Sequence, residues 1–270
     1  MTPVKITKMS GAGNDFIVLD ALGAAAIGED LAAWTRAVCR RGLSVGADGV
    51  LVVTPEAEGR VRVDFRNPDG SVAFCGNGTR CAARYAAARG WCGERTLLST
   101  AVGPVPAEIR NGRVRLTLPP PVDRGALVLT ARGTRFEGRW VDSGVPHFVV
   151  PVEDVATAPL ASFGPLLRAD PAWGPSGANV DVVSRAADGS HHVRTWERGV
   201  ENETLACGTG AVAAALAARL LGAGETVRIV PASGIPLEVT LPGDPRAPSS
   251  AELAGDARFV FEGTLSPEAR

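Results

Sequence analysis

Two cysteines stand immediately before a glycine-rich turn and an alanine-rich run, and they are the residues best suited to chemistry. Cys75 opens "CGNGTRCAARYAAARG" and Cys207 opens "CGTGAVAAALAARLLG". Each alanine-rich run predicts a helix, so each cysteine is expected at a helix N-terminus, where unpaired N–H groups and the helix dipole favour negative charge. This position predicts a thiol whose pKa falls from about 8.5 toward neutrality, beside a cradle for a carboxylate or phosphate.

Two such turns indicate acid/base chemistry on a single carbon. Inverting a carbon that bears a weakly acidic hydrogen requires a base on one face and an acid on the other. One thiolate would remove the proton and the opposite thiol would supply a new one, while the helix dipoles stabilise the charge that develops on an adjacent carboxylate. No lysine stands in a motif for a pyridoxal Schiff base, and no metal is required. The residues predict a racemase or epimerase with Cys75 and Cys207 as its catalytic pair.

The elements that position these cysteines occur twice in the chain. Cys75 and Cys207 are 132 residues apart, and three further matches follow the same order at nearly the same offset. They pair "SGAGNDFIV" with "SGVPHFVV", "GLSVGADGVLVV" with "GPSGANVDVV", and "TAVGPVPAEI" with "VPASGIPLEV". Ordered matches of this kind indicate an internal duplication.

Each half predicts the same mixture of strands and helices. Short apolar runs between Gly, Pro and Asp predict strands at 16–21, 49–53, 61–65, 114–119, 147–152, 192–196, 227–232 and 258–263. Helices are predicted at 31–41, 79–90 and 210–222, with Gly90 and Gly222 ending the last two, and 242–257 is expected to be a loop. The fold class expected is α+β, with two similar lobes of residues 1–119 and 120–257 and an active site in the cleft between them.

Composition narrows the class of protein. The 270 residues are 45% hydrophobic and 21% charged, which suits a chain with a buried core. The net charge is −1 and no block of Lys and Arg appears, so neither a nucleic-acid nor a membrane partner is expected. Apolar runs are too short to span a bilayer, and no secretory signal is visible. Five cysteines, an odd number, favour reduced thiols and a cytoplasmic location.

The motifs resemble a known family across nearly the whole chain. "SGAGNDFIVLD", "VGADGVL", "NPDGSVAFCGNGTRC", "GANV" and "ERGVENETLACGTGAVA" are similar, in this order, to the motifs of diaminopimelate epimerases. The resemblance implies a cofactor-independent isomerase, without a metal, that interconverts LL- and meso-diaminopimelate for lysine and peptidoglycan precursor synthesis. It also implies a homodimer. Each chain would form two lobes, each of them a strand barrel around a central helix, with a C-terminal strand of about 258–270 returning to the first lobe.

The resemblance further implies roles for individual residues. Backbone N–H groups of Gly76 and Asn77, with those of Gly208 and Thr209, would bind the reacting α-carboxylate. Substrate contacts, chiefly at its distal end, would come from Asn14, Asn67, Asn179, Glu197 and Arg198. His147 and Glu197 are the residues that would assist a thiol.

Several alternatives stay open at this point. Val145 and Gly177 differ from common residues of the family, so a two-cysteine racemase of another amino acid remains an alternative. A thiol redox protein that joins Cys75 to Cys207, and a non-catalytic binding module, are the alternatives from other classes. "GTGAVA" fits a dinucleotide-binding pattern but lacks a βαβ setting and an acidic residue about twenty positions later. The remaining cysteines, Cys39, Cys81 and Cys92, are expected to be packing residues.

Overall fold

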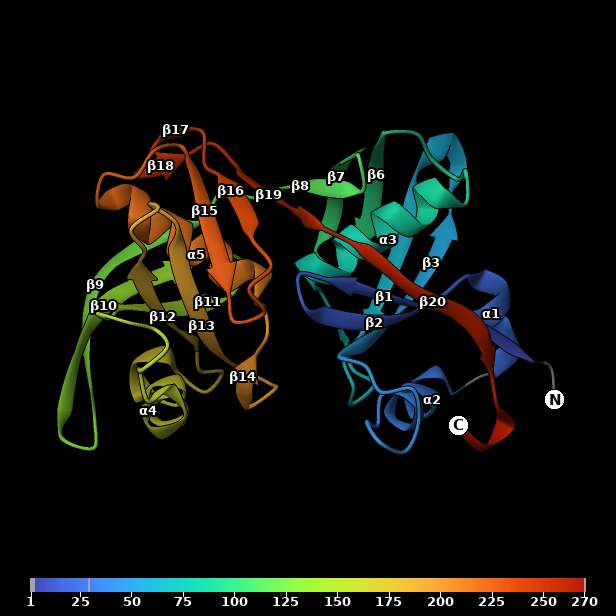
Figure 1. Ribbon diagram of the computed structural model, residues 1–270, viewed down its shortest axis with the longest axis horizontal. Helices are drawn as coiled ribbons and strands as arrows, with labels where there is room; N and C mark the ends of the chain where they lie inside the picture. Colours follow the sequence, from blue (N-terminus) through green and yellow to red (C-terminus); the bar gives the residue numbers. More distant parts are fainter. Residues whose placement is uncertain (1–2, 29, 270) are drawn as a thin grey trace. The chain divides into compact units, whose positions relative to one another are not determined.

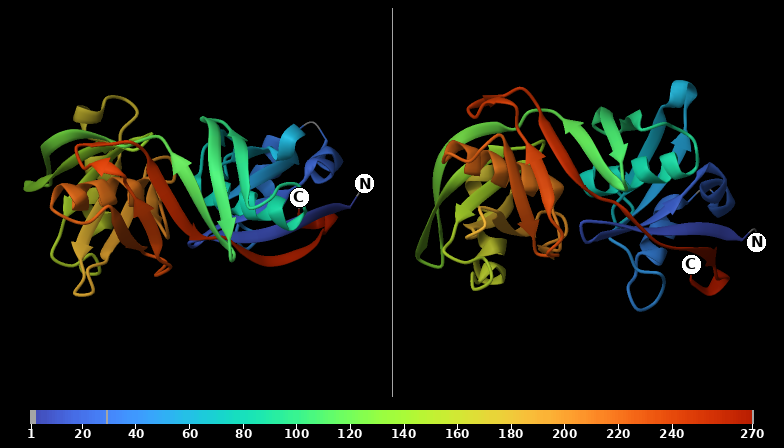
Figure 2. Two further views of the ribbon diagram at one scale, coloured as in Figure 1. Left: turned by 90° about the horizontal axis from the view of Figure 1, so that it is seen from above. Right: turned by 45° about the horizontal axis from the view of Figure 1, so that its top comes forward.

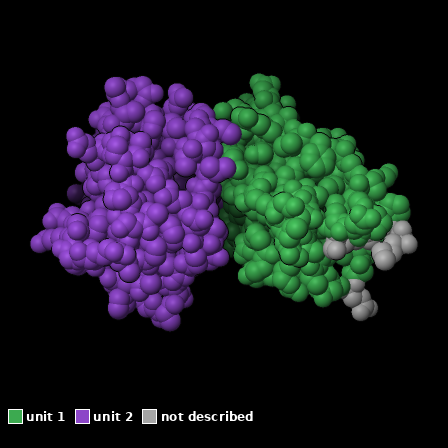
Figure 3. Space-filling model, turned by 60° about the horizontal axis from the view of Figure 1, so that its bottom comes forward, with its two compact units in different colours: residues 1–116, 255–270 green, residues 117–254 purple. Residues whose placement is uncertain are grey.

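The computed structural model describes residues 3–28 and 30–269, and the chain divides into two compact units (Figure 3). Unit 1 comprises Met1–Leu116 with Gly255–Arg270, and unit 2 comprises Thr117–Ala254. Parallel and antiparallel strand pairs occur together in each unit, beside a small number of helices. The α+β class and the two similar halves are confirmed.

Unit 1 surrounds one long helix with strands. Its helices are α1 (Ala21–Ile27), α2 (Leu31–Val38) and α3 (Gly76–Ala88). Its strands are β1 (Val4–Gly11), β2 (Asn14–Leu19), β3 (Gly49–Pro55), β4 (Val61–Arg66), β5 (Val72–Ala73), β6 (Arg95–Thr100), β7 (Gly103–Arg110), β8 (Arg113–Leu118) and β20 (Arg258–Leu265). The C-terminal β20 pairs antiparallel with β1, and the two run side by side in Figure 2 (red and blue).

Unit 2 repeats this plan. Its helices are α4 (Leu160–Arg168) and α5 (Gly208–Leu220). Its strands are β9 (Val122–Ala131), β10 (Thr134–Asp142), β11 (Pro146–Pro151), β12 (Asn179–Arg185), β13 (His191–Glu197), β14 (Asn202–Thr204), β15 (Thr226–Pro231), β16 (Leu237–Thr240), β17 (Gly243–Asp244), β18 (Ala247–Pro248) and β19 (Ala251–Asp256). Three-residue 3-10 helices complete the chain at Ala57–Gly59, Pro171–Trp173 and Pro267–Ala269.

The order of strand pairing confirms the internal duplication. In unit 1, β2–β3 is parallel, β3–β4 antiparallel and β4–β6 parallel. In unit 2, β11–β12, β12–β13 and β13–β15 repeat these three pairings in the same senses. The helices α3 and α5 have 13 residues each and begin 132 positions apart.

Each central helix lies inside its own strand layer (Figure 1). Helix α3 contacts β1, β2, β3, β4, β6 and β7, and α5 contacts β10, β11, β12, β13, β15 and β16. Ten residues of each helix are buried, which small Gly and Ala side chains permit because strands can then approach the helix from several sides. Among the described residues, no helix is both long and apolar enough to cross a membrane.

Buried apolar and exposed polar side chains alternate along strands such as β4, so one face of the strand can pack against the core. Val61, Val63 and Phe65 of β4 are buried while Arg62 and Asp64 are exposed, so one face of the strand is apolar. In unit 2 the outer face of the sheet packs under α4 in a cluster of aromatic and aliphatic side chains. These include Phe148, Leu160, Phe163, Trp173 and Val180.

Several predicted elements differ from the structure. Helices α1 and α4 lie outside the predicted set, although Asp20 caps α1 by accepting a hydrogen bond from Gly23 N at 2.7 Å. Helix α2 ends at Val38 rather than at residue 41. The expected loop at 242–257 is wrong, since it contains β17, β18 and β19. Strand β19 has few β-branched residues, and its pairing with β16 gives it an extended conformation that local propensity does not.

The predicted C-terminal strand is present but shorter. It ends at Leu265 because Pro267 has no N–H to donate to the ladder and instead begins a 3-10 turn. Residue 270, the predicted end, lies outside the described residues. The predicted helix stops are confirmed, since Gly90 and Gly222 adopt φ values of 71° and 98° directly after the helices end.

Candidate active site

Both cysteines cap the central helices with their own sulfur atoms. Cys75 is the N-cap of α3, where Gly78 N–H donates to its Sγ at 3.5 Å. Cys207 is the N-cap of α5, where Gly210 N–H donates to its Sγ at 3.3 Å. Their backbones are extended, with φ of −137° and −114°, so each chain turns into the helix at the cysteine. The predicted location of both thiols at helix N-termini is confirmed.

The surroundings of Cys207 raise the pKa of its thiol, whereas the sequence predicts a lowered pKa. Burial raises the pKa of Cys207 well above its ordinary value, and the Glu197 and Asp181 carboxylates raise it further. The Thr209 hydroxyl and the Gly210 N–H lower it, but by less. The expectation of a lowered pKa is therefore wrong at Cys207, because desolvation and two nearby negative charges outweigh the helix terminus.

The first turn of each central helix also carries the predicted backbone donors. Gly76 and Asn77 follow Cys75, and Gly208 and Thr209 follow Cys207, at the positions whose N–H groups have no partner inside an α-helix. Two such N–H groups beside a thiol can hold a carboxylate through charge-assisted hydrogen bonds. The geometry is the same in both units.

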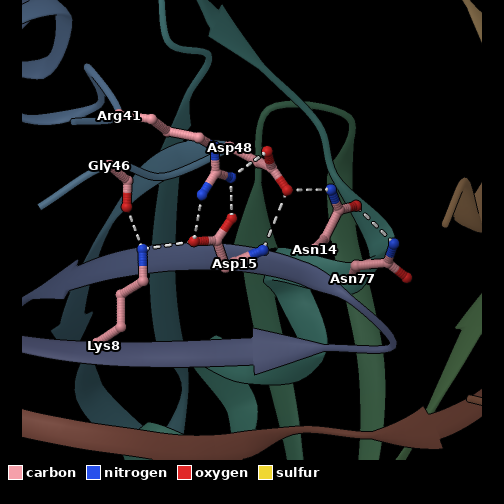
Figure 4. Close-up of polar contacts among 7 residues, drawn as sticks. All are labelled: Lys8, Asn14, Asp15, Arg41, Gly46, Asp48 and Asn77. Atoms are coloured by element: carbon pink, nitrogen blue, oxygen red, sulfur yellow. Dashed lines mark hydrogen bonds and ion pairs between the residues drawn. The ribbon is translucent and has the colours of Figure 1, made fainter. Parts of the chain in front are cut away.

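A polar network in unit 1 holds Asn77 and Asn14 in place (Figure 4). Asn77 Nδ2 donates to Asn14 Oδ1 at 2.7 Å, and Asn14 Nδ2 donates to Asp48 Oδ2 at 2.8 Å. Asp48 in turn accepts from Arg41 at 2.8 Å. Two predicted substrate-binding residues, Asn14 and Asn77, are thus hydrogen-bonded to each other, and Asp48, which was not predicted as a site residue, accepts from the Asn14 amide.

The same network continues to a charged cluster behind β1 and β2. Asp15 pairs with Lys8 at 2.6 Å and also with Arg41, and Lys8 donates to the Gly46 carbonyl. Burial by itself would raise the pKa of Asp15, but hydrogen bonds from Arg41 and Lys8 outweigh it and hold the pKa below the ordinary 3.8. The cluster anchors the loop that carries Asp48.

Arg80 places a fully buried cation near Cys75. Its side chain is 0% exposed, donating through Nη2 to Asn77 Oδ1 at 2.9 Å and through Nε to the Asp256 carbonyl at 3.3 Å. Burial lowers the pKa of Arg80, while attraction to negative charge at Cys81 and Cys75 opposes that shift. The equivalent position in unit 2, 132 residues later, is the apolar Val212.

In unit 2 a buried polar chain leads away from Cys207. Cys207 Sγ lies 3.3 Å from Thr209 Oγ1, which lies 3.0 Å from His147 Nε2. His147 Nδ1 lies 2.7 Å from Asp181 Oδ2. His147 and Asp181 are both fully buried. The predicted thiol-assisting residue His147 is therefore connected to Cys207 through a hydroxyl.

Asn179 joins this group, and two other predicted residues lie beside it. Asn179 Nδ2 is 3.2 Å from His147 Nε2, and Asn179 Oδ1 accepts from Arg198 N–H at 2.8 Å. Glu197 accepts from Thr204 Oγ1 at 2.8 Å and raises the pKa of Cys207. Asn67 is used locally, since Asn67 Nδ2 donates to Ser71 Oγ at 3.1 Å.

Several residues that shape the site were not predicted as site residues, although two of them, Asp48 and Arg80, lie within the motifs "VGADGVL" and "NPDGSVAFCGNGTRC". They are Asp48 and Arg80 in unit 1 and Asp181 and Thr195 in unit 2. The sequence does contain a signal for Asp181. An acidic residue within the buried run "NVDVV" must find polar partners in the interior. Arg80 is the opposite case, since its place on an alanine-rich helix gives no indication of complete burial.

Of the other cysteines, Cys39 and Cys81 are buried and Cys92 is half-buried. Burial raises the pKa of Cys39 to about 12 and also raises the pKa values of Cys81 and Cys92. These positions suit packing rather than chemistry. Within residues 3–28 and 30–269, no group of three or more His, Cys, Asp or Glu side chains is placed to hold a metal ion.

Solved structures define the class of fold. The chain superimposes on a hydroxyproline epimerase from Agrobacterium vitis with a TM-score of 0.73 and 18% identity, over 98% of this chain and 92% of that one. It matches a PhzF-family phenazine biosynthesis protein from Bacillus anthracis with a TM-score of 0.75 and 14% identity, over 98% and 100%. The chain thus has the fold of these hydroxyproline epimerase and PhzF-family proteins.

Sequence comparison then identifies the family. The diaminopimelate epimerase family model matches residues 6–118 and 139–260. A diaminopimelate epimerase from Aquifex aeolicus is 39% identical over 97% of both chains, and one from Methanothrix thermoacetophila is 38% identical over 99% of this chain and 98% of its own. The chain belongs to the diaminopimelate epimerase family.

Proposed function

We propose that the protein interconverts LL- and meso-diaminopimelate, with Cys75 and Cys207 as the acid/base pair. The observation that carries this proposal is the equivalent placement of two thiols, each capping the central helix of one half of a duplicated fold. The names of the full-length relatives support the choice of substrate.

In the proposed reaction one thiolate takes the α-proton and the other thiol delivers a proton to the opposite face of the carbon. The first-turn N–H groups of α3 and α5 bind the α-carboxylate and stabilise the negative charge that develops on it. This chemistry requires both helix N-termini to reach one substrate molecule. Asn14, Asn67 and Asn179, with Glu197 and Arg198, are proposed to contact the distal amino acid group, for which a guanidinium and amide or acidic oxygens are suitable partners.

The direct experiment follows conversion of LL-diaminopimelate to the meso form by chiral chromatography. The reaction is proposed to need neither pyridoxal phosphate nor metal, so dialysis against a chelator and treatment with hydroxylamine should leave the rate unchanged. A rate that falls with either treatment would contradict the two-thiol chemistry. The same assay with other amino acids tests the choice of substrate.

A two-cysteine racemase of another amino acid is the second candidate, and Gly177 is the observation that favours it. Gly177 has a φ of 69°, and a Cβ there would lie 2.6 Å from the Arg168 carbonyl and 2.7 Å from an Arg168 guanidinium nitrogen. The Arg168 side chain therefore lies next to a position that has no side chain of its own. Conversion of another amino acid, with none of diaminopimelate, would favour this candidate.

Assembly and location complete the proposal. We propose a cytoplasmic homodimer, in keeping with the reduced thiols and with the family resemblance. Light scattering should give twice the mass of the 27.9 kDa chain. A mass equal to one chain at working concentration would contradict the dimer.

A further inference from the structure

A cavity lies beside the C-terminal half of α5, and residues of unit 2 line it. Its volume is about 570 Å³, a size typical of binding sites for small organic molecules. Small apolar side chains form much of its wall, among them Ala214, Ala217 and Ala218 of α5 and Val149 and Val183 of the sheet. The cavity can therefore admit a small organic ligand.

This cavity is separate from the candidate active site. Cys207 caps the N-terminus of α5, whereas Ala214, the first residue of the helix to line the cavity, follows seven positions later. A rise of about 1.5 Å per residue places even Ala214 about 10 Å along the helix from Cys207. Within unit 2, where every residue is described, no predicted site residue lines the cavity.

The two central helices end with the same backbone hydrogen bonds. Trp91 N–H donates to the Ala86 carbonyl at 3.0 Å after α3, and Ala223 N–H donates to the Ala218 carbonyl at 3.0 Å after α5. Both the donors and the acceptors are 132 positions apart, which is the offset between the two helices. The side chains at the two helix ends can therefore be compared position by position.

In unit 1 the positions that correspond to Ala217 and Ala223 carry aromatic side chains. Tyr85 corresponds to Ala217 and is 2% exposed, and Trp91 corresponds to Ala223. The two aromatic rings meet edge-on, with their centroids 5.6 Å apart. Aromatic side chains bury about 150–250 Å² each. Because unit 2 has alanine at both positions, its cavity lies where unit 1 holds an aromatic pair.

The strand beside this space carries a cation in unit 2. Strands β1 and β10 correspond, since they pair antiparallel with the equivalent strands β2 and β11. Tyr85 is hydrogen-bonded to the Thr7 side chain of β1, whereas β10 contributes Arg139 to the cavity wall. Arg139 donates through Nη1 to Asp123 Oδ2 at 2.6 Å. A guanidinium has five N–H donors, so others are left for a ligand.

Two further basic side chains favour an anion in the cavity. Arg185 and His191 both line it, and burial followed by the charge of Arg185 lowers the pKa of His191. His191 Nδ1 is buried and has no hydrogen-bond partner among the described residues. Glu137, an acidic residue of the wall, is paired with Arg135 at 3.2 Å. The balance of charge around the cavity is therefore positive.

We propose that this cavity binds a small aromatic carboxylate. The ring packs against the alanines of α5, in the place that Tyr85 and Trp91 take in unit 1. The carboxylate accepts hydrogen bonds from Arg139 and Arg185. Burial of the ring is favoured by the apolar wall, and hydrogen bonds between a guanidinium and a carboxylate are about twice as strong as neutral ones. The site does not depend on the proposed epimerisation.

Isothermal titration with 3-phenylpropanoate tests the site, and 3-phenylpropanamide is the uncharged match. Wild type should bind the acid, and Ala217→Tyr, which introduces the ring that unit 1 carries, should weaken binding by roughly tenfold or more. Arg185→Gln should weaken binding of the acid by roughly tenfold and leave binding of the amide unchanged. Ala88→Tyr makes the same substitution at an exposed residue of α3 and should bind like wild type.

Equal affinity of wild type and Ala217→Tyr for the acid would overturn the proposal, and so would equal affinity of wild type for the acid and the amide. Thermal unfolding checks that each variant is folded. If a second copy of the chain filled the cavity instead, wild type would bind no acid and Ala217→Tyr would have a smaller mass than wild type in light scattering. That outcome would also overturn the proposal.

NMR of labelled valine methyl groups locates the bound acid. The signals of Val149 and Val183 should shift, whereas that of Val212, in the first turns of α5, should not. A shift confined to Val212 would place the acid at the helix N-terminus near Cys207 and would contradict the proposal. The titration measures binding alone, so its failure is distinct from a failure to convert diaminopimelate.

Discussion

At the residue scale, the two thiols have different surroundings despite their equivalent backbones. Cys75 lies near Arg80, a buried guanidinium that attracts a thiolate, whereas Cys207 lies near Glu197 and Asp181, which repel one. The sequence predicts the shared feature, the helix N-terminus, because glycine turns and alanine runs are local signals. It does not predict the difference, because the burial of Arg80 and the approach of Glu197 and Asp181 to Cys207 depend on how the strands pack around each helix.

The charged cluster behind Asn14 makes stability depend on pH. The folded pKa of Asp15 lies below its unfolded value near 3.8, so its contribution to stability is complete above that value and is lost as the pH falls through the folded pKa. Asp15→Asn removes the carboxylate while keeping its shape. It should lower the free energy of unfolding by about 1–3 kcal/mol at pH 7.

Urea unfolding of both proteins at several pH values measures this effect. The difference between wild type and Asp15→Asn should shrink as the pH drops below 4. The exposed Asp64 of β4 gives the control, since Asp64→Asn should change little at any pH. A difference that is constant from pH 7 to pH 3 would show that the Asp15 carboxylate does not contribute in this way.

At the element scale, α5 approaches its sheet closely at Gly210, beside Asp181 and Thr195. A Cβ at Gly210 would lie 2.6 Å from Asp181 Oδ1 and 3.1 Å from Thr195 Oγ1. A Cβ at Gly78, the equivalent residue of α3, would have its nearest contact at 3.2 Å, with the flexible end of Leu51. The position of Gly210 in unit 2 therefore has less room for a side chain than the position of Gly78 in unit 1.

The matched substitutions Gly210→Ala and Gly78→Ala test this difference. Gly210→Ala should lower stability by about 1–3 kcal/mol and reduce the epimerisation rate, because α5 or Asp181 must move. Gly78→Ala should change stability by less than about 1 kcal/mol, since the gain in helix propensity offsets the tighter packing. Thermal unfolding and rates of the two variants measure both effects, and equal losses would contradict the role of close approach.

The elements themselves could be predicted in part. Helices α3 and α5 and the strands with alternating apolar residues, such as β4, were accessible from periodicity and from glycine stops. Helix α4 was not, because Pro165 and Gly164 lie inside it and its formation depends on burying Phe163 and Leu167 against the sheet. Strand β19 was not, because pairing with β16 determines it.

At the scale of the whole molecule, duplication explains how one fold supplies two equivalent thiols. The offset of 132 residues predicts the repeat, and the matching order of strand pairing confirms it. Site residues within one unit, such as His147 with Asn179, are brought together by adjacent strands in parallel register. Their contact could not be predicted from the sequence, because register across β11 and β12 depends on the complete sheet.

The proposed chemistry also predicts how the protein responds to oxidation. If both thiols reach one α-carbon, a mild oxidant should remove two electrons and two protons from them and join Cys75 to Cys207 in a disulfide. The oxidised protein should be inactive and should recover with dithiothreitol. Peptide mass spectrometry identifies the pair, and full activity in protein that carries this disulfide would contradict the mechanism.

The most direct test of the account is proton NMR of LL-diaminopimelate with reduced protein in D₂O. Wild type should exchange the α-proton for deuterium, with loss of the α-proton signal, as the meso form appears. Cys92→Ser, a change at a half-buried cysteine outside both capping turns, should behave in the same way. Cys75→Ser and Cys207→Ser should each lose epimerisation by roughly a thousandfold or more. Undiminished epimerisation in either of these two variants, or no exchange by folded wild type, would contradict the central claim.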